Sequence, residues 1–293
     1  KGSCGHNPRA ENLDLETIKP PIRDKRRLTW GYHLMNAGIE ALETSRGCTR
    51  SCNFCSMKNM YGRRFRVYPV ARVLADIDDI YYKRKVKSIF ITDDNMVLNP
   101  GRVIKLCDAI IAKGYKNLKL YVQADCVTMS TREDMVAKMA AAGFKSVFLG
   151  IANGSKKNLN VAGKGDIVQA SKQAIANCHR HGMMVIGGLI FGFPEDDEQS
   201  IRKNYNFFKE IGADAAYCQI ITPYPKTGMR EDLLAQDLIT NKDDVKKYNK
   251  DVRNIKRVKE EQSIRIKNSY EEIKTKKKTD EIMHKKTIIK KKK

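Results

Sequence analysis

Three cysteines lie within eight residues of one another, Cys48, Cys52 and Cys55. Their close spacing indicates that they could bind a metal together. Cysteine thiolates are the usual ligands of iron–sulfur clusters and of structural zinc. A structural zinc site takes four ligands, usually as two separated pairs, but the sequence has no second C-x-x-C and no histidine near this stretch. Three thiolates on a four-iron cluster leave one iron open to a small molecule. The spacing therefore favours a 4Fe–4S cluster with an open position.

Short apolar runs alternate with helical patterns along the chain. The runs predict six strands, at residues 39–45, 88–94, 118–125, 146–152, 183–194 and 215–225. A strand–helix repeat implies parallel strands joined by right-handed crossovers. The repeat covers about 190 residues, fewer than the roughly 250 of a full eight-fold barrel. The predicted fold is therefore α/β, a partial (β/α)6 TIM-type barrel, with a doubly wound open sheet as the structural alternative.

Polar residues follow several of these strands, at the edge of a parallel sheet where ligand sites form. They lie at 45–55 after the first strand, at Asp93, Asp94 and Asn95 after the second, from Gln123 to Asp125 at the end of the third, from Asn153 to Ser155 after the fourth, and at 222–224 in the sixth. Carboxylate and amide oxygens accept hydrogen bonds from an amine. A strand followed by Asp-Asp-Asn is also a common Asx turn, so the strand ends alone leave both interpretations open.

The residue before the third cysteine completes a longer signature. Phe54 precedes Cys55, so the segment reads C-x-x-x-C-x-aromatic-C. It resembles the signature of the radical S-adenosylmethionine (radical SAM) superfamily, whose members share a partial six-unit α/β barrel. The resemblance implies that S-adenosylmethionine binds the open iron and that one electron cleaves it to a 5′-deoxyadenosyl radical. A flavodoxin- or ferredoxin-type protein is the expected electron donor. The chain itself is expected to orient the cosubstrate and to exclude water from the site.

The resemblance also implies which residues contact the cosubstrate S-adenosylmethionine. The implied contacts are Phe54, Asp93, Asp94, Asn95, Gln123, Asn153, Ser155, Gly188 and Gly192. The segment "TDDN" matches the family motif that receives the amino group. The run "GLIFGFP" at 188–194 resembles the strand that packs along the adenine, where glycines let a ligand approach the backbone closely. A buried strand ending in a turn explains the same glycines without a ligand.

One position departs from the family pattern. Related proteins usually carry "G-I-E-x-G-S" after the fourth strand, where the Glu contacts the cosubstrate, whereas this chain reads "GIANGS" with Ala152 in that place. A methyl group accepts no hydrogen bond. Losing the one charge-assisted hydrogen bond to the cosubstrate costs about 1.5–3 kcal/mol of binding free energy. Asn153 and Ser155 are the nearest substitutes. The departure raises the alternative of a catalytically weakened remnant that binds a cluster but cleaves little cosubstrate.

The segments "ETSRGCTRSCNFCS", "TDDN" and "TPYP" look most like radical SAM proteins that carry a cobalamin-binding domain. In that branch the cobalamin domain precedes the barrel, and residues 1–38 read as a linker from such a domain. Cobalamin is therefore expected only in a longer parent protein. The branch implies methyl transfer or rearrangement, and nothing in the sequence chooses the substrate. Methylthiotransferases, which modify tRNA, are the alternative within the superfamily.

The charge of the chain is concentrated at one end. Of the net charge of +22, residues 241–293 contribute +11, from 20 basic and 9 acidic residues. This stretch contains no Gly, Pro, Cys, Phe or Trp and predicts a Lys-rich tail, helical or disordered, after a core at 39–240. RNA binding through the tail is an alternative function, although the tail lacks interleaved aromatic residues for base stacking. A shifted reading frame in an A- and T-rich gene is a further hypothesis for such a run.

The composition of the rest points to a reduced cellular compartment. Hydrophobic residues make up 41% of the 293 residues, which is enough for a sizeable core. No apolar run reaches the roughly 18 residues of a membrane span. The five cysteines outside the cluster stretch are scattered, unlike those of a disulfide-rich secreted scaffold. These features predict a cytoplasmic enzyme without a membrane span.

Overall fold

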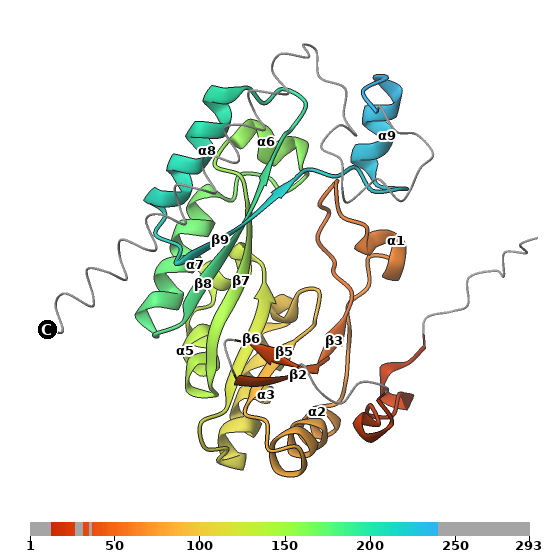
Figure 1. Cartoon of the computed structure of the whole chain (residues 1–293), viewed down its shortest axis with the longest axis vertical. Helices are drawn as coiled ribbons and strands as arrows, with labels where there is room; N and C mark the ends of the chain where they lie inside the picture. Colours follow the sequence, from red (N-terminus) through yellow and green to blue (C-terminus); the bar gives the residue numbers. More distant parts are fainter. Residues whose placement is uncertain (1–12, 27–31, 35–36, 240–293) are drawn as a thin grey trace, which may run out of the picture.

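Six parallel strands form the centre of the structure (Figure 1). The computed structural model describes residues 13–26, 32–34 and 37–239. The parallel strands are β2 (Ala37–Leu42), β5 (Ser88–Ile91), β6 (Lys119–Ala124), β7 (Phe144–Ala152), β8 (Met184–Phe191) and β9 (Ala215–Ile220). An antiparallel strand, β1 (His33–Leu34), pairs with β2, and β3 (Ser45–Arg46) pairs with β4 (Arg66–Val67) in a separate small sheet. The six predicted strands are confirmed, the first of them beginning at Ala37.

Helices connect successive parallel strands and cover one face of the sheet (Figure 1). The α-helices of the described residues are α1 (Met57–Tyr61), α2 (Val70–Asp78), α3 (Pro100–Lys113), α4 (Cys126–Thr131), α5 (Glu133–Ala141), α6 (Lys156–Val161), α7 (Val168–Arg180), α8 (Glu198–Glu210) and α9 (Gly228–Ala235). The strands stand in the sheet in their chain order, whereas a doubly wound sheet reverses its order at a switch point. The fold is therefore a partial (β/α)6 barrel. None of the described helices is both long and apolar enough to cross a membrane.

Local chemistry sets where the helices begin and end. The Asn99 side chain accepts a hydrogen bond from the N–H of Arg102 at the start of α3, and Gly114, with φ of 65°, ends that helix in the left-handed conformation. Asp197 and Ser200 form a capping box at the start of α8. These signals fix where α3 begins and ends and where α8 begins.

The sheet has one buried face and one open face. In β6, Leu120 and Val122 are fully buried under the helices, while Tyr121 between them is only half-buried. Phe90 lies opposite Tyr121 in the register of β5 and β6 and is 36% exposed. Side chains alternate between faces along a strand, so Phe90 and Tyr121 share the open face. Within the described part of the chain, no helix covers these two aromatic side chains.

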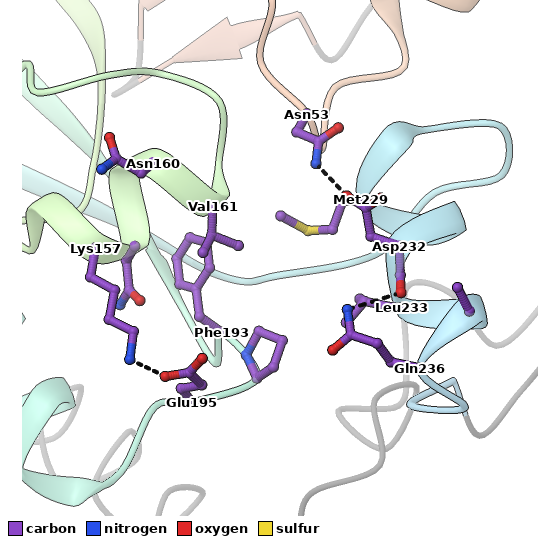
Figure 2. A pocket seen from close by; sticks show the side chains of 13 residues that line it. Asn53, Lys157, Asn160, Val161, Phe193, Glu195, Met229, Asp232, Leu233 and Gln236 are labelled. Atoms are coloured by element: carbon purple, nitrogen blue, oxygen red, sulfur yellow. Dashed lines mark hydrogen bonds and ion pairs between the residues drawn. The ribbon is translucent and has the colours of Figure 1, made fainter.

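The last described helix, α9, lies beside the loop that carries the three cysteines (Figure 1). Asn53 in that loop donates from Nδ2 to Oδ2 of Asp232 in α9 at 3.0 Å. Asn59 of α1 donates to the carbonyl of Lys226, just before α9. Figure 2 shows the loop, α6 and α9 around one cleft. The cysteine loop, which follows the first strands, therefore contacts the end of the barrel.

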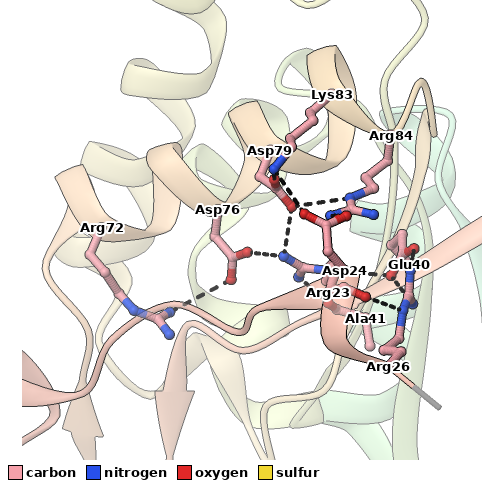
Figure 3. Close-up of polar contacts among 10 residues, drawn as sticks. All are labelled: Arg23, Asp24, Arg26, Glu40, Ala41, Arg72, Asp76, Asp79, Lys83 and Arg84. Carbon is pink, nitrogen blue, oxygen red and sulfur yellow. Dashed lines mark hydrogen bonds and ion pairs between the residues drawn. The ribbon is translucent and has the colours of Figure 1, made fainter.

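One buried arginine fixes residues 13–26 to the barrel (Figure 3). The Arg23 side chain is 5% exposed and forms an ion pair with Asp76 of α2. Its Nε lies 3.4 Å from Oε2 of Glu40, and its Nη2 donates to the carbonyl of Ala41 at 2.9 Å. Both partners belong to β2. Part of the segment that the sequence assigns to a linker therefore packs on the first strand–helix unit. The polar composition of residues 1–38 predicts a linker, but the ion pair between Arg23 and Asp76 holds residues 13–26 against the barrel.

Replacing Arg23 by lysine is expected to lower the free energy of unfolding by about 2 kcal/mol. An ammonium keeps the charge but cannot reach the acidic side chains and the β2 carbonyl from one planar fork. Urea unfolding followed by circular dichroism measures the change. The matched control is Arg132→Lys, in the exposed pair with Asp134, which should cost less than about 1 kcal/mol. Equal losses in both variants would show that the buried contacts add nothing.

Candidate functional site

The three cysteines lie on the loop between β3 and α1, and their thiols are free and half-buried. Gly47 attaches the start of this loop to the end of β5, because its N–H donates to Oδ2 of Asp94 at 2.8 Å. Gly47 has φ of 88°, and a Cβ there would lie 2.1 Å from the carbonyl oxygen of Arg64. Only glycine permits this approach. The Asp94 carboxylate therefore holds the cysteine loop by a hydrogen bond from the backbone N–H of the loop.

The three thiols form a donor set that suits an iron–sulfur cluster. Burial raises the pKa of Cys48 and of Cys55, and the nearby charge of Cys52 raises both further. Among the described residues, no three Cys, His, Asp or Glu side chains converge as ligands of one metal ion. Each cysteine of a four-iron cluster binds a different iron, so three thiolates suit such a cluster with one open iron, whereas structural zinc takes four ligands.

Asp93 supports the backbone that precedes the cysteine loop. Its side chain is 1% exposed and accepts hydrogen bonds at 2.6 Å from both the N–H and the hydroxyl of Thr44, and one from the Ser45 hydroxyl. Burial raises the pKa of Asp93, and these donors oppose that shift. The buried guanidinium of Arg102 donates to the carbonyl of Thr44 at 2.7 Å. A cosubstrate amine would have to compete with these donors for Asp93.

Asn95 is the residue after β5 that contacts a cysteine. Its Nδ2 donates to Sγ of Cys48 at 3.9 Å and to Oδ2 of Asp125 at 3.0 Å. The residue is 4% exposed, and within the described structure its Oδ1 is buried without a hydrogen-bond partner. An unsatisfied buried acceptor costs about 1–3 kcal/mol. An amine donor placed beside Cys48 would satisfy this oxygen.

Asp125 connects the Asn95 amide to a positive charge. It accepts from the N–H of Thr128 at 2.9 Å, which caps α4, and from Nη2 of Arg50 at 2.7 Å. Arg50 lies on the cysteine loop between Cys48 and Cys52. Polar contacts thus lead from the loop through Asn95 and Asp125 back to the loop. Asp125 ends the polar segment 123–125 that the sequence predicts at the strand ends, and Asp-x-x-Thr after a strand is also a local signal of a helix cap.

The strand β7 ends in a strained turn at Ala152. This residue has φ of 65°, and the N–H of Asn153 donates to the carbonyl of Ile151 at 2.9 Å, which closes a three-residue turn. Ala152 is 2% exposed and belongs to an apolar cluster with Ile190 and Phe193. A left-handed conformation at a non-glycine residue persists only where the surroundings determine it. The position that holds Glu in related proteins is therefore apolar and enclosed here.

The two nearest substitutes for the missing Glu already hold this turn together. Asn153 donates from Nδ2 to the carbonyl of Ile190 at 3.1 Å and accepts at Oδ1 from the N–H of Ser155 at 2.8 Å. The Ser155 hydroxyl caps α6 by accepting from the N–H of Asn158. Contacts from either residue to the cosubstrate remain predictions, and each would have to displace one of these bonds.

The two predicted glycines, in β8 and directly after it, have structural roles of their own. A Cβ at Gly188 would lie 2.5 Å from the ring of Phe148, so that ring occupies the space. Gly192 has φ of 81°, and its N–H donates to Oδ2 of Asp196 at 2.9 Å. Gln123 is half-buried on the open face of β6. Their contacts with the cosubstrate remain predictions.

Two clefts adjoin the cysteine loop at the strand ends. One, of about 170 Å³, is lined by Phe54 and Cys55 and by the ends of β8 and β9. The other, of about 250 Å³, includes Cys52, Arg50 and Lys164 in its lining. Lys164 is a basic residue that the sequence patterns did not indicate, since it lies in a turn far from the cysteines along the chain. The loop therefore has space for a small molecule beside its cysteines.

A partial (β/α)6 barrel with three free cysteines on the loop after its first strands has the architecture of a radical SAM enzyme. The sequence profile of the Radical SAM superfamily matches residues 42–208, more than half of the chain. The chain belongs to the radical SAM superfamily.

Known relatives of the chain include methyltransferases. An uncharacterized methyltransferase of Pyrococcus horikoshii is 31% identical over 196 residues, covering 67% of this chain and 42% of the relative. Bacteriochlorophyllide d C-12(1)-methyltransferase of Chlorobaculum tepidum is 26% identical over 233 residues, covering 77% of this chain and 49% of the relative. The chain thus spans less than half the length of these two relatives.

Solved structures share the fold. The cobalamin-dependent S-adenosylmethionine radical enzyme OxsB, with aqua-cobalamin and S-adenosylmethionine bound, matches with a TM-score of 0.65 at 19% identity, covering 77% of this chain and 40% of OxsB. The radical S-adenosylmethionine methyltransferase TsrM from Kitasatospora setae matches with a TM-score of 0.62 at 18% identity, covering 69% of this chain and 37% of TsrM. At these identities the likeness extends to the fold alone.

Proposed function

We propose that this chain is the core of a radical SAM methyltransferase. In this proposal Cys48, Cys52 and Cys55 hold a 4Fe–4S cluster and leave one iron for S-adenosylmethionine. With one electron from an external reductant, the bound cluster would supply the cleavage of the cosubstrate to methionine and a 5′-deoxyadenosyl radical. Methyl transfer is favoured over rearrangement because both named sequence relatives are methyltransferases. The substrate is left open.

The unpartnered Oδ1 of Asn95 is the observation that carries the proposal. It lies beside Cys48, and the hydrogen bonds of Nδ2 to Cys48 and Asp125 orient it. An ammonium group donates and does not accept, so the amino group of S-adenosylmethionine is a matching partner. Arg50 and Lys164, in the cleft beside Cys52, supply cations for its carboxylate. The chain thus offers complementary groups for both charged ends of the methionine part.

The cleft beside Cys55 suits the adenosyl end of the cosubstrate. Phe54, Ile190 and Ile221 provide apolar walls there, which favour a flat aromatic base. Gln219 lines the same cleft and supplies an amide that sequence patterns did not single out. In this proposal the apolar walls orient the base and exclude water, and Gln219 takes over polar contacts that Ala152 cannot make.

Anaerobic reconstitution tests the proposed function. The protein is loaded with iron and sulfide, reduced with dithionite and mixed with S-adenosylmethionine, and 5′-deoxyadenosine is measured by chromatography. The expected result is a brown chromophore and 5′-deoxyadenosine that depends on the reductant. A protein that forms the cluster but releases no 5′-deoxyadenosine supports the weakened cluster-binding alternative. A protein that binds no cluster contradicts the proposal.

Replacing Asn95 by leucine is expected to weaken S-adenosylmethionine binding about 10- to 100-fold. Leucine has a similar volume but no acceptor, and one hydrogen bond to a charged group contributes about 1.5–3 kcal/mol. Equilibrium dialysis against the cluster-loaded protein measures the affinity, and iron content is measured in parallel. Asn206→Leu, at an exposed position of α8, is the control. An Asn95→Leu protein with full iron content and unchanged affinity would contradict this role of Asn95.

Further partners follow from the family. A flavodoxin- or ferredoxin-type donor is proposed as the physiological reductant. Cobalamin is proposed only for a longer protein that contains this core, by likeness to OxsB. RNA binding through the basic tail falls on residues 241–293, outside the described residues. No contact of the described residues favours it, or the tRNA-modifying alternative, over methyl transfer.

A further inference from the structure

Asn53 lies between Cys52 and Phe54 and joins the cysteine loop to two helices (Figure 2). Its N–H donates to the carbonyl of Ala162 at 2.8 Å, at the end of α6. Its carbonyl accepts from the N–H of Met229 at 3.1 Å, in the first turn of α9. Its Nδ2 donates to Oδ2 of Asp232 at 3.0 Å. We call these three hydrogen bonds the Asn53 latch.

The backbone part of the Asn53 latch uses groups that helices leave unpaired. The last carbonyls and the first N–H groups of a helix have no partner within the helix. Asn53 supplies a donor for Ala162 at the end of α6 and an acceptor for Met229 at the beginning of α9. One residue of the cysteine loop therefore pairs one carbonyl at the end of α6 and one N–H at the beginning of α9. This explains why an otherwise irregular loop is held against the final part of the barrel.

Two glycines make room for Asn53. A Cβ at Gly228 would lie 2.0 Å from Oδ1 of Asn53, and all the nearest atoms belong to the Asn53 side chain. A Cβ at Gly163, where φ is 66°, would lie 3.0 Å from the carbonyl of Ser51 and 3.1 Å from the N–H of Asn53. Both glycines thus lie in close contact with this part of the loop, and neither position has room for a side chain. The position of the loop between its second and third cysteines is tightly defined.

We propose that Asn53 is a positioning residue that sets where Cys52 and Cys55 place their sulfurs. This rests on the proposed function in that the sulfurs are taken as cluster ligands. Asn53 is bonded to Cys52 directly in the chain and precedes Cys55 by two residues. Partners that orient metal ligands typically contribute 10- to 100-fold to metal affinity. The Asn53 latch therefore makes cluster retention depend on α9, which lies far from the cysteines along the chain.

Iron loss from the reconstituted protein tests the Asn53 latch. Asn53→Ala and Asp232→Ala are expected to lose iron to a chelator about tenfold faster than the unchanged protein. Asp232→Asn keeps an acceptor oxygen and should stay within about twofold of it. Asn206→Ala on α8 is the control. Unchanged iron loss in both alanine variants would overturn the proposal, and so would equally fast loss in Asp232→Asn and Asp232→Ala.

A second readout uses the protein without iron. Alkylation by iodoacetamide, with peptide mass mapping, reports the exposure of Cys52 and Cys55 separately from the buried cysteines. Asn53→Ala is expected to raise both alkylation rates several-fold while the circular dichroism spectrum and melting temperature stay unchanged. A fall in melting temperature with no change in alkylation would overturn the positioning role. If the unchanged protein binds no iron, the proposed function fails, whereas this readout still tests the Asn53 latch.

Gly228→Ala separates the Asn53 latch from a general effect on α9. Alanine favours a helix over glycine, so the added methyl group should harm only through its clash with Asn53. Iron loss is expected to accelerate about tenfold when Gly228→Ala is made alone. It should not accelerate further when Gly228→Ala is added to Asn53→Ala, because the clashing side chain is then absent. An equal effect of Gly228→Ala in both backgrounds would overturn the proposal.

Discussion

Cys52→Ala is expected to abolish cluster binding and, with it, all production of 5′-deoxyadenosine. Loss of one thiolate leaves a second iron of the proposed cluster without a protein ligand, and Cys48 and Cys55 cannot replace it because each binds its own iron. Buried cysteines elsewhere cannot substitute either. Cys107 in α3 and Cys178 in α7 are fully buried in the core, outside the cysteine loop.

The matched control for this prediction is Cys107→Ala. Cys107 is fully buried in α3, outside the cysteine loop, so the change leaves a small cavity at a modest cost in stability. Iron and sulfide analysis, the visible absorption spectrum and the yield of 5′-deoxyadenosine are measured for both variants. Iron retained by Cys52→Ala at the level of the control would exclude Cys52 as a ligand. Iron lost equally by both variants would place the effect in folding rather than ligation.

The strands and their order could be predicted from the sequence because the signals are local. Apolar runs such as 146–152 correspond to β7, and the helical patterns between runs require the parallel connections that the sheet shows. The cysteine signature is local as well. Gly47 sits beside it because only glycine adopts the conformation that brings this loop to Asp94. The fold class is therefore predicted from short stretches of sequence, and the proposed cluster ligands rest on a short stretch as well.

The rest of the site depends on contacts between distant residues, which no local pattern contains. Asn53 and Asp232 are 179 positions apart, and nothing around either residue identifies the other. Asp93 and Asn95 are near neighbours in a polar segment, yet the structure gives them different tasks. Asp93 binds Thr44, whereas Asn95 contacts Cys48. Packing decides that the Asn95 oxygen lacks a hydrogen-bond partner while the Asp93 oxygens are bonded. The sequence therefore predicts the polar segment but not what each of its residues contacts.

Ala152 is where resemblance and structure give different expectations for one substitution. By resemblance, Ala152→Glu returns a polar contact that related proteins have, so S-adenosylmethionine should bind more tightly. In the structure Ala152 is 2% exposed and packs with Ile190 and Phe193. Its backbone is left-handed, with φ of 65°. An introduced carboxyl group would therefore enter an apolar cluster whose neighbouring amide, on Asn153, is already bonded to Ile190 and Ser155.

Ala152→Glu is accordingly expected to lower the free energy of unfolding by about 3–5 kcal/mol at neutral pH, the usual cost of an uncompensated buried charge. Burial raises the pKa of the introduced carboxyl group above its unfolded value. The charge penalty is therefore absent below the unfolded pKa and grows as pH rises towards the folded pKa. Ala152→Gln has nearly the same volume without a charge, so its loss of stability should not change with pH. Urea unfolding of both variants at acidic and neutral pH measures the difference. A stable Ala152→Glu protein with tighter S-adenosylmethionine binding would show instead that the position can open to the cosubstrate, as the weakened-remnant alternative requires.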